Sequence, residues 1–168
     1  MSRVVVVTDS TASLPTEVAE ARGVRVVPLQ VVIGAAVLEE GPGGATPDVV
    51  AEALRDFVPV STSRPAPALF AELYRSLAAE GADEIVSVHL SGEMSGTFES
   101  AQLGALEVDL PVQTLNTRAS TAEVAIAASR WRTTSATKMK SRVCSPSPWM
   151  PISRPSRSRS AKIEITPE

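Results

Sequence analysis

Short runs of β-branched residues alternate with helical patterns along most of the chain, and this alternation restricts the possible folds more than any other feature. Arg3–Val7 ends in four consecutive valines, which is typical of a strand covered on both faces. Further extended segments are expected at Val24–Ile33, interrupted by Pro28, at Glu84–Leu90 and at Val112–Leu115. The pattern predicts an α/β fold with a mostly parallel sheet and helices on both faces.

Helix start and stop signals fall between these extended segments. Ser13 followed by Pro15 predicts a helix over residues 15–22, which Gly23 ends. The other expected helices cover Val49–Phe57, Pro67–Glu80 and Phe98–Leu106. Two stretches without a strand signal, Gly34–Thr46 and Ser61–Pro65, are expected to be loops.

Composition excludes several classes of protein. The apolar content of 43% supports a core, but an aromatic content of 4% means that aliphatic residues must build it. The single cysteine, Cys144, cannot form an internal disulfide and has no histidine near it in the sequence. The four-valine run is shorter than a signal-peptide core of roughly 7–15 residues, and no stretch approaches the roughly 20 residues of a membrane span. We therefore expect a cytoplasmic protein without stable membrane insertion.

Three hydroxyl-rich segments are expected at the carboxyl ends of strands, where parallel α/β sheets bind their ligands. They are Thr8–Thr11, Ser61–Ser63 and Ser91–Thr97. Taken singly, each cluster is more typical of helix caps and turns. Together, hydroxyls and the free N–H groups of helix N-termini indicate a site for an anionic head group.

The charge of these segments favours a carboxylate over a polyphosphate. They hold no lysine, the nearest arginine is Arg64, and the chain lacks both a P-loop and a GxGxxG motif after a strand. No cluster of His, Cys and Asp has the spacing of metal ligands. Asp9 is equally typical of a cap and of a site residue. His89 is more typical of a hydrogen-bonded strand residue than of a residue that binds a ligand. A phosphotransfer enzyme of similar architecture remains an alternative, with His89 as its only candidate nucleophile.

Five segments, in order over about residues 3–120, resemble the DegV family. They are VVVVTDSTASLP, VVPLQVVIG, STSRPAPALFAELYRSL, DEIVSVHLSGEMSGTFESA and PVQTLNTRAS. Departures from the family pattern are Arg64 in place of a usual Gln, Ala66, Gly92 in place of a second serine, and Asn116 in place of Asp.

The resemblance implies a fatty-acid-binding protein that is not an enzyme and needs no cofactor. Its ligand would be a long-chain fatty acid such as palmitate or oleate, presented for lipid transport or fatty-acid metabolism. A fatty acid kinase subunit would be the partner of a full-length member, forming the acyl phosphate. By the family pattern, Thr62 and Ser95 would contact the carboxylate. The neighbouring residues would be Ser63, Gly96, Thr97, Asp9 and Ser10.

The last quarter of the chain differs from the rest in charge and composition. Residues 1–117 hold six arginines, no lysine and 16 acidic residues, whereas residues 118–168 hold ten basic and three acidic residues. We therefore divide the chain into a DegV-like domain over 1–128 and an irregular basic tail over 129–168.

A shifted reading frame is one origin for such a tail. Back-translation of RWRTTSATKMKS in another frame gives VADDVGDEDEV, which resembles the family's continuation, so we hypothesise a frameshift near residue 129. One wall of the acyl site would then be missing, and we expect weak or no fatty-acid binding. The alternatives are a non-functional fragment and a genuine basic tail that contacts nucleic acid or acidic lipid; we favour no nucleic-acid partner, because the tail has little aromatic interleaving.

Overall fold

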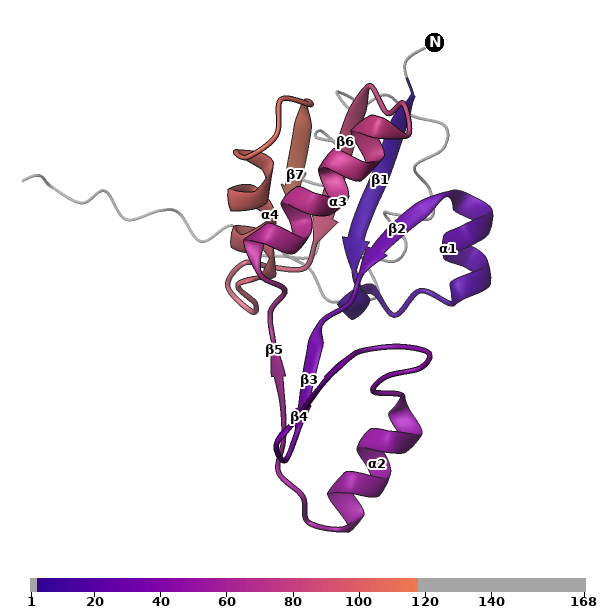
Figure 1. Ribbon diagram of the computed structural model, residues 1–168, viewed down its shortest axis with the longest axis vertical. Coiled ribbons are helices and arrows are strands. Elements are labelled where there is room, and N and C mark those ends of the chain that lie inside the picture. Colours follow the sequence, from indigo (N-terminus) through magenta and orange to yellow (C-terminus); the bar gives the residue numbers. More distant parts are fainter. Residues whose placement is uncertain (1–2, 118–168) are drawn as a thin grey trace, which may run out of the picture.

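A four-stranded parallel sheet forms the centre of the protein, for which the computed structural model describes residues 3–117 (Figure 1). Its strand order is β2 (Val24–Val27), β1 (Val4–Asp9), β6 (Glu84–His89) and β7 (Val112–Asn116). Every neighbouring pair is parallel, with Val6 of β1 paired to Val24 on one side and to Val86 on the other. The expected α/β fold with a mostly parallel sheet is confirmed.

Helices cover both faces of this sheet. Alternate residues of its strands point to opposite sides, so the apolar strands present two faces that must be buried. Val6 belongs to the core cluster that includes Ala19 of α1 (Thr16–Arg22). Val5 and Val7 belong to the other cluster, with Phe70 of α3 (Pro67–Ala79). The third helix on this sheet is α4 (Thr97–Ala105), which packs beside α3.

Helices α3 and α4 approach each other closely at Gly104. A Cβ atom at this position would lie 2.7 Å from the Cβ of Phe70 and 2.8 Å from the carbonyl oxygen of Pro67. Because real Cβ atoms do not make such contacts, glycine is what lets the two backbones pack at this distance.

A second, smaller sheet was not expected from the sequence. It is antiparallel, with the order β4 (Ala36–Glu39), β3 (Gln30–Ile33) and β5 (Val60–Ser63), and it forms the smaller lobe with α2 (Pro47–Arg55) (Figure 1). The expectation of loops at Gly34–Thr46 and Ser61–Pro65 was therefore wrong for residues 36–39 and 61–63, which lie in β4 and β5. Strand β5 has exposed polar side chains, so its extended state comes from backbone pairing with β3 rather than from a hydrophobic pattern.

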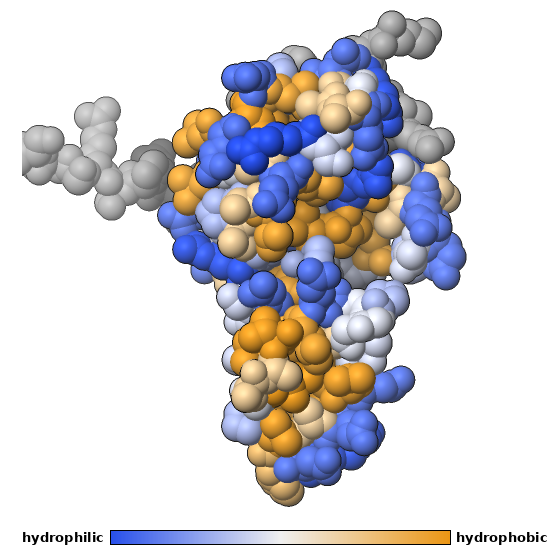
Figure 2. All heavy atoms as spheres, in the orientation of Figure 1, coloured by the Kyte–Doolittle hydropathy of each residue, from blue (hydrophilic) through white to orange (hydrophobic). Residues whose placement is uncertain are grey.

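The smaller lobe carries much of the exposed apolar surface (Figure 2). Its large exposed apolar side chains are Val37, Val49, Leu54 and Phe57. Phe57 is 94% exposed and has a left-handed backbone with a φ of 56°. It stands where a helix C-terminus usually has glycine: the amide of Phe57 donates to Leu54, and that of Val58 donates to Ala53. No helix of the described residues is both long and apolar enough to cross a membrane.

Candidate functional site

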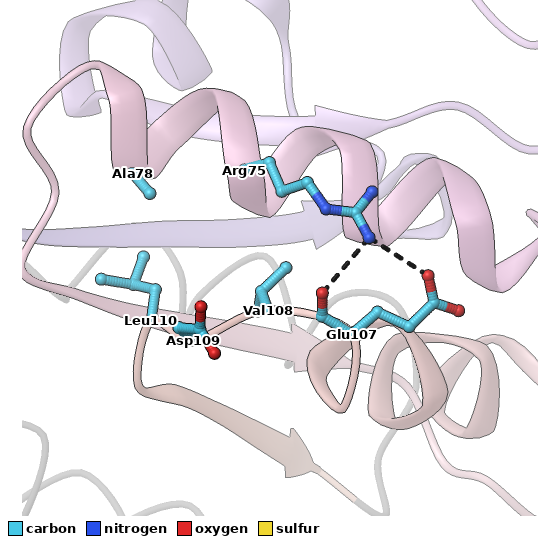
Figure 3. A pocket seen from close by; sticks show the side chains of 6 residues that line it. All are labelled: Arg75, Ala78, Glu107, Val108, Asp109 and Leu110. Atoms are coloured by element: carbon cyan, nitrogen blue, oxygen red, sulfur yellow. Dashed lines mark hydrogen bonds and ion pairs between the residues drawn. The ribbon is translucent and has the colours of Figure 1, made fainter.

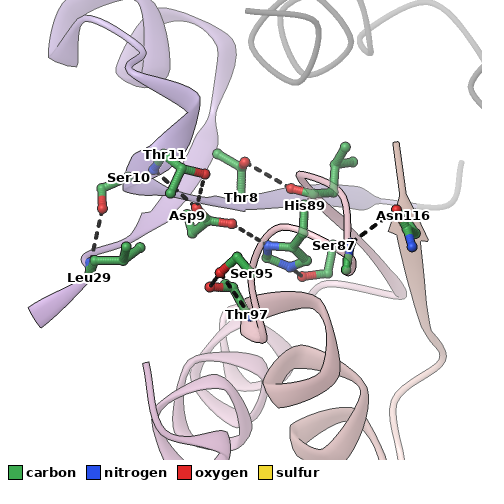
Figure 4. Close-up of polar contacts among 12 residues, drawn as sticks. Thr8, Asp9, Ser10, Thr11, Leu29, Ser87, His89, Ser95, Thr97 and Asn116 are labelled. Carbon is green, nitrogen blue, oxygen red and sulfur yellow. Dashed lines mark hydrogen bonds and ion pairs between the residues drawn. The ribbon is translucent and has the colours of Figure 1, made fainter. Parts of the chain in front are cut away.

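Two of the three hydroxyl-rich segments lie at the carboxyl edge of the parallel sheet, as expected (Figure 4). Thr8–Thr11 ends β1 and continues into a 3-10 turn over Ser10–Ala12, whereas Ser91–Thr97 follows β6 and leads into α4. The third segment was placed wrongly, because Ser61–Ser63 lies within β5 of the antiparallel sheet rather than in a turn after a parallel strand.

The turn that precedes α4 orients the hydroxyl of Ser95. The amides of Met94 and Ser95 both donate to the carbonyl of Ser91, at 2.9 and 3.1 Å, which closes the turn. The Ser95 hydroxyl then accepts a hydrogen bond from the amide of Thr97 at 3.3 Å and lies 2.9 Å from the Thr97 hydroxyl. Ser95 is half-buried and Thr97 is fully buried. The result is an ordered pair of hydroxyls at the positive N-terminal end of α4.

Arg64 joins the end of β5 to this turn. Its Nη1 donates to the carbonyl of Gly96 at 3.3 Å and to Oε2 of Glu99 at 2.8 Å. Thr62, two residues before Arg64, is exposed and pairs with Val31 of β3. The segments that contain Thr62 and Ser95 are therefore adjacent, although no hydrogen bond joins these two residues within the described part of the chain. The neighbouring Ser63 is exposed and its hydroxyl lies 3.4 Å from the carbonyl of Arg64.

Asp9 and Ser10 are both engaged by protein groups. Asp9 is fully buried; its Oδ1 accepts hydrogen bonds from the amide and the hydroxyl of Thr11, so Asp9 caps the 3-10 turn. The Ser10 hydroxyl donates to Glu40 at 2.6 Å and accepts from the amide of Leu29 at 2.9 Å. Of the two interpretations of Asp9, the structure favours the cap.

Behind the turns, a buried chain of hydrogen bonds runs from α3 through β6 to β1. Figure 4 shows its part from Ser87 through His89 to Asp9. The Tyr74 hydroxyl lies 2.7 Å from the Ser87 hydroxyl, which lies 2.8 Å from Nε2 of His89. Nδ1 of His89 lies 2.6 Å from Oδ2 of Asp9. All four side chains are fully buried. Each hydrogen has one acceptor if Tyr74 donates to the Ser87 hydroxyl, the Ser87 hydroxyl donates to Nε2 of His89, and Nδ1–H of His89 donates to the Asp9 carboxylate. We therefore infer from the network that His89 carries its proton on Nδ1.

Burial affects the titration of the tyrosine in this chain of hydrogen bonds. It raises the pKa of Tyr74 to about 12, because the phenolate would lose its hydration, and the hydrogen bond with Ser87 opposes this increase.

The sequence indicated only part of this network. His89 is a hydrogen-bonded strand residue, as one interpretation held, but Ser87 and Tyr74 were not recognised as its partners. Ser87 and His89 are two residues apart in a strand that is otherwise apolar after Glu84, so their shared face was a usable signal. The contact with Tyr74 depends on how α3 packs on the sheet.

A separate hollow of about 270 Å³ lies at the C-terminal end of α4, away from Ser95 (Figure 3). It is lined by Arg75, Ala78, Glu107, Val108, Asp109 and Leu110. None of the residues singled out from the sequence lines it. Within residues 3–117, no three or more His, Cys, Asp or Glu side chains are grouped so that they could hold a metal ion.

Fold and turns together define an α/β domain with a hydroxyl-lined turn at the carboxyl edge of its parallel sheet and a fully buried histidine behind it. The chain belongs to the DegV family, whose model, described as "Uncharacterised protein, DegV family", matches residues 3–137.

Two similar curated proteins are DegV domain-containing proteins. The one from Streptomyces coelicolor is 52% identical over 118 residues, which are 70% of this chain and 42% of that protein. The one from Halalkalibacterium halodurans is 40% identical over 101 residues, which are 60% of this chain and 36% of that protein. The chain therefore spans less than half the length of these relatives.

Solved structures give the same family. A DegV family protein from Thermus thermophilus, described as fatty-acid binding, has a TM-score of 0.76 and 34% identity, covering 84% of this chain and 52% of its own. DegV from Bacillus subtilis, described as a fatty acid binding protein, has a TM-score of 0.74 and 26% identity, covering 85% and 53%. The predicted boundary at residue 128 and the basic tail lie outside the described residues.

Proposed function

We propose that this chain binds a long-chain fatty acid, such as palmitate or oleate, through its carboxylate. The hydroxyls of Thr62 and Ser95 hold the head group, and Ser63, Gly96 and Thr97 surround it. The observation that carries the proposal is the contact of Arg64 with Gly96 and Glu99, which brings the end of β5 against the turn before α4.

The chemistry of this turn suits a carboxylate. Hydroxyl donors and the N-terminal end of a helix stabilise a negative charge. The fatty-acid-binding description of the Thermus thermophilus relative, at 34% identity, supports the choice of ligand. The function would be carriage and presentation of the acyl chain in the cytoplasm for lipid transport or fatty-acid metabolism, rather than catalysis by this chain itself.

Further proposals concern the protein as a whole. Residues 1–128 form the fatty-acid-binding domain, and residues 129–168 form a basic tail of separate origin. In a full-length protein, a fatty acid kinase subunit would phosphorylate the presented carboxylate. Because each buried methylene contributes about 0.8 kcal/mol, the affinity for a long fatty acid would depend on how many of its methylenes the protein buries.

The alternative of a phosphotransfer enzyme is not favoured. It needs an accessible histidine, and His89 is fully buried with hydrogen bonds at both ring nitrogens. A nucleophile in this position would have to leave Asp9 and Ser87 before it reached a phosphoryl group.

Lipid extraction and ligand-induced stabilisation test the proposal. Because a frameshift near residue 129 would leave one wall of the acyl site missing, binding should be weak: little fatty acid should copurify with the protein, but added palmitate or oleate in excess should raise the melting temperature by mass action. Ser95→Ala and Thr62→Ala should each reduce this shift, whereas Ser61→Ala, which removes a neighbouring exposed hydroxyl of β5, should leave it unchanged. Absence of bound lipid together with an unchanged melting temperature would reject the function.

A further inference from the structure

The guanidinium of Arg64 lies on the turn that we assign to the head group. Its side chain is 51% exposed and reaches from the end of β5 to the first turn of α4. Gly96 makes this position possible, because a Cβ atom there would lie 2.8 Å from Cδ and 3.0 Å from Cζ of Arg64. Arg64 therefore lies next to Ser95, on a surface that a ligand can reach.

Only part of the guanidinium is used by the protein. Nη1 donates to Gly96 and to Glu99, and within residues 3–117 the Nε and Nη2 groups of Arg64 have no hydrogen-bond partner. Arginine presents its N–H donors in a planar fork that matches the two oxygens of a carboxylate. Glu99, 66% exposed, holds Nη1 in place and also offsets part of its charge.

We propose that Arg64 is a specificity-determining residue. Its free N–H groups bind the carboxylate of a fatty acid and so select this anion over an uncharged fatty alcohol or ester. The inference rests on the proposed function and adds a charged contact to the hydroxyls of Thr62 and Ser95. It also gives the binding of the head group a dependence on salt, because a half-exposed charge is screened by ions.

The chain contains a matched control for this residue. Arg75 makes the same pair of contacts at the other end of α4, where its Nη2 donates to the carbonyl of Glu107 at 3.2 Å and to its carboxylate at 3.3 Å. The side chain of Arg75 is 54% exposed, close to the value for Arg64. Arg75→Gln and Arg64→Gln therefore change the net charge equally and disrupt similar ion pairs, but only Arg64 lies at the proposed site.

The experiment measures head-group selectivity with short, soluble probes, so that the acyl contacts contribute little. The isotope-labelled chain is titrated with octanoate and with 1-octanol, and amide shifts of Ser95 and Gly96 give the two dissociation constants. Arg64→Gln should weaken octanoate about fivefold relative to octanol, which corresponds to about 1 kcal/mol at a half-exposed site. Arg75→Gln should leave this ratio unchanged.

Two further variants separate binding from folding. Gly96→Ala keeps every charge but displaces the guanidinium, so it should reduce the selectivity in the same direction as Arg64→Gln. Glu99→Gln keeps an acceptor for Nη1 and removes a competing carboxylate, so it should strengthen octanoate and leave octanol unchanged.

The outcomes distinguish this inference from the function on which it rests. If octanoate shifts the Ser95 and Gly96 amides, but the octanoate-to-octanol ratio is the same in the wild type and in Arg64→Gln, the role of Arg64 is wrong and the proposed function stands. If octanoate does not perturb these amides in the wild-type chain, both the function and the inference fail.

Discussion

Tyr74 makes the stability of this domain depend on pH in the alkaline range, and the effect can be isolated because it is the only tyrosine of the chain. Its hydroxyl is buried and lies 2.7 Å from that of Ser87. Burial raises its pKa to about 12, against about 10 in the unfolded chain. Because the folded pKa is the higher one, the folded state favours the protonated phenol. The associated stability is fully present below about pH 10 and is lost as the pH rises towards about 12.

The magnitude follows from the difference in pKa. A difference of about two units corresponds to about 2.7 kcal/mol, of which roughly half, about 1.4 kcal/mol, is lost at about pH 11. The substitution Tyr74→Phe removes the hydrogen bond to Ser87, which costs about 1 kcal/mol at neutral pH. It also removes the titrating group. The free energies of unfolding of wild type and variant should therefore become equal between about pH 10 and pH 11, where the loss reaches about 1 kcal/mol, and at higher pH the variant should be the more stable.

Urea denaturation of both proteins between about pH 8 and pH 11, followed by circular dichroism, measures this difference. The titration of all other groups is common to wild type and variant, so it cancels in the comparison. The ultraviolet absorption of the phenolate gives the pKa in the native state independently. A native tyrosine that ionises near its ordinary value of about 10, or a stability difference that does not change with pH, would refute the buried hydrogen-bond chain.

Two further substitutions test the packing and the backbone. Gly104→Val should destabilise the domain by about 1–3 kcal/mol, because the new side chain would overlap Phe70 and the carbonyl of Pro67. An unchanged urea midpoint would contradict the close approach of α3 and α4. Leu103→Ala, at an exposed position of α4, is the control. Phe57→Gly should stabilise by about 1 kcal/mol, since its φ of 56° is costly for any residue with a Cβ atom. A drop in melting temperature on this change would show that the aromatic ring contributes more than the strain.

The sequence predicted the parallel sheet because its strands carry their own signal. Val4–Val7 and Ile85–Val88 are covered on both faces, so their continuous hydrophobic pattern identifies them without knowledge of their neighbours. Strands β4 and β5 lack such a pattern. Thr62 is extended because Val31 of β3 pairs with it, and this pairing is a tertiary contact between segments about thirty residues apart.

The same distinction explains which site features were predictable. The turn Ser91–Thr97 follows a recognisable strand and begins a recognisable helix, so its position at the carboxyl edge could be predicted. The hydrogen bond of Arg64 to Gly96 and that of Tyr74 to Ser87 each join two parts of the fold that are distant in the sequence. Neither has a periodicity or a spacing from which it could be found, because both depend on how the elements pack.

These two contacts have different consequences for mutation. The hydrogen-bond network that links Tyr74, Ser87, His89 and Asp9 is fully buried. Its disruption would therefore leave buried polar groups without partners and reduce the free energy of unfolding. Arg64 and Glu99 are exposed over half their side-chain surface, and such ion pairs contribute only about 0–1 kcal/mol to folding. Yet Arg64 is the contact by which the end of β5 reaches the turn of Ser95. Substitution at this position should therefore alter the binding of the head group while the domain remains folded, which makes stability and ligand selectivity separately measurable in one chain.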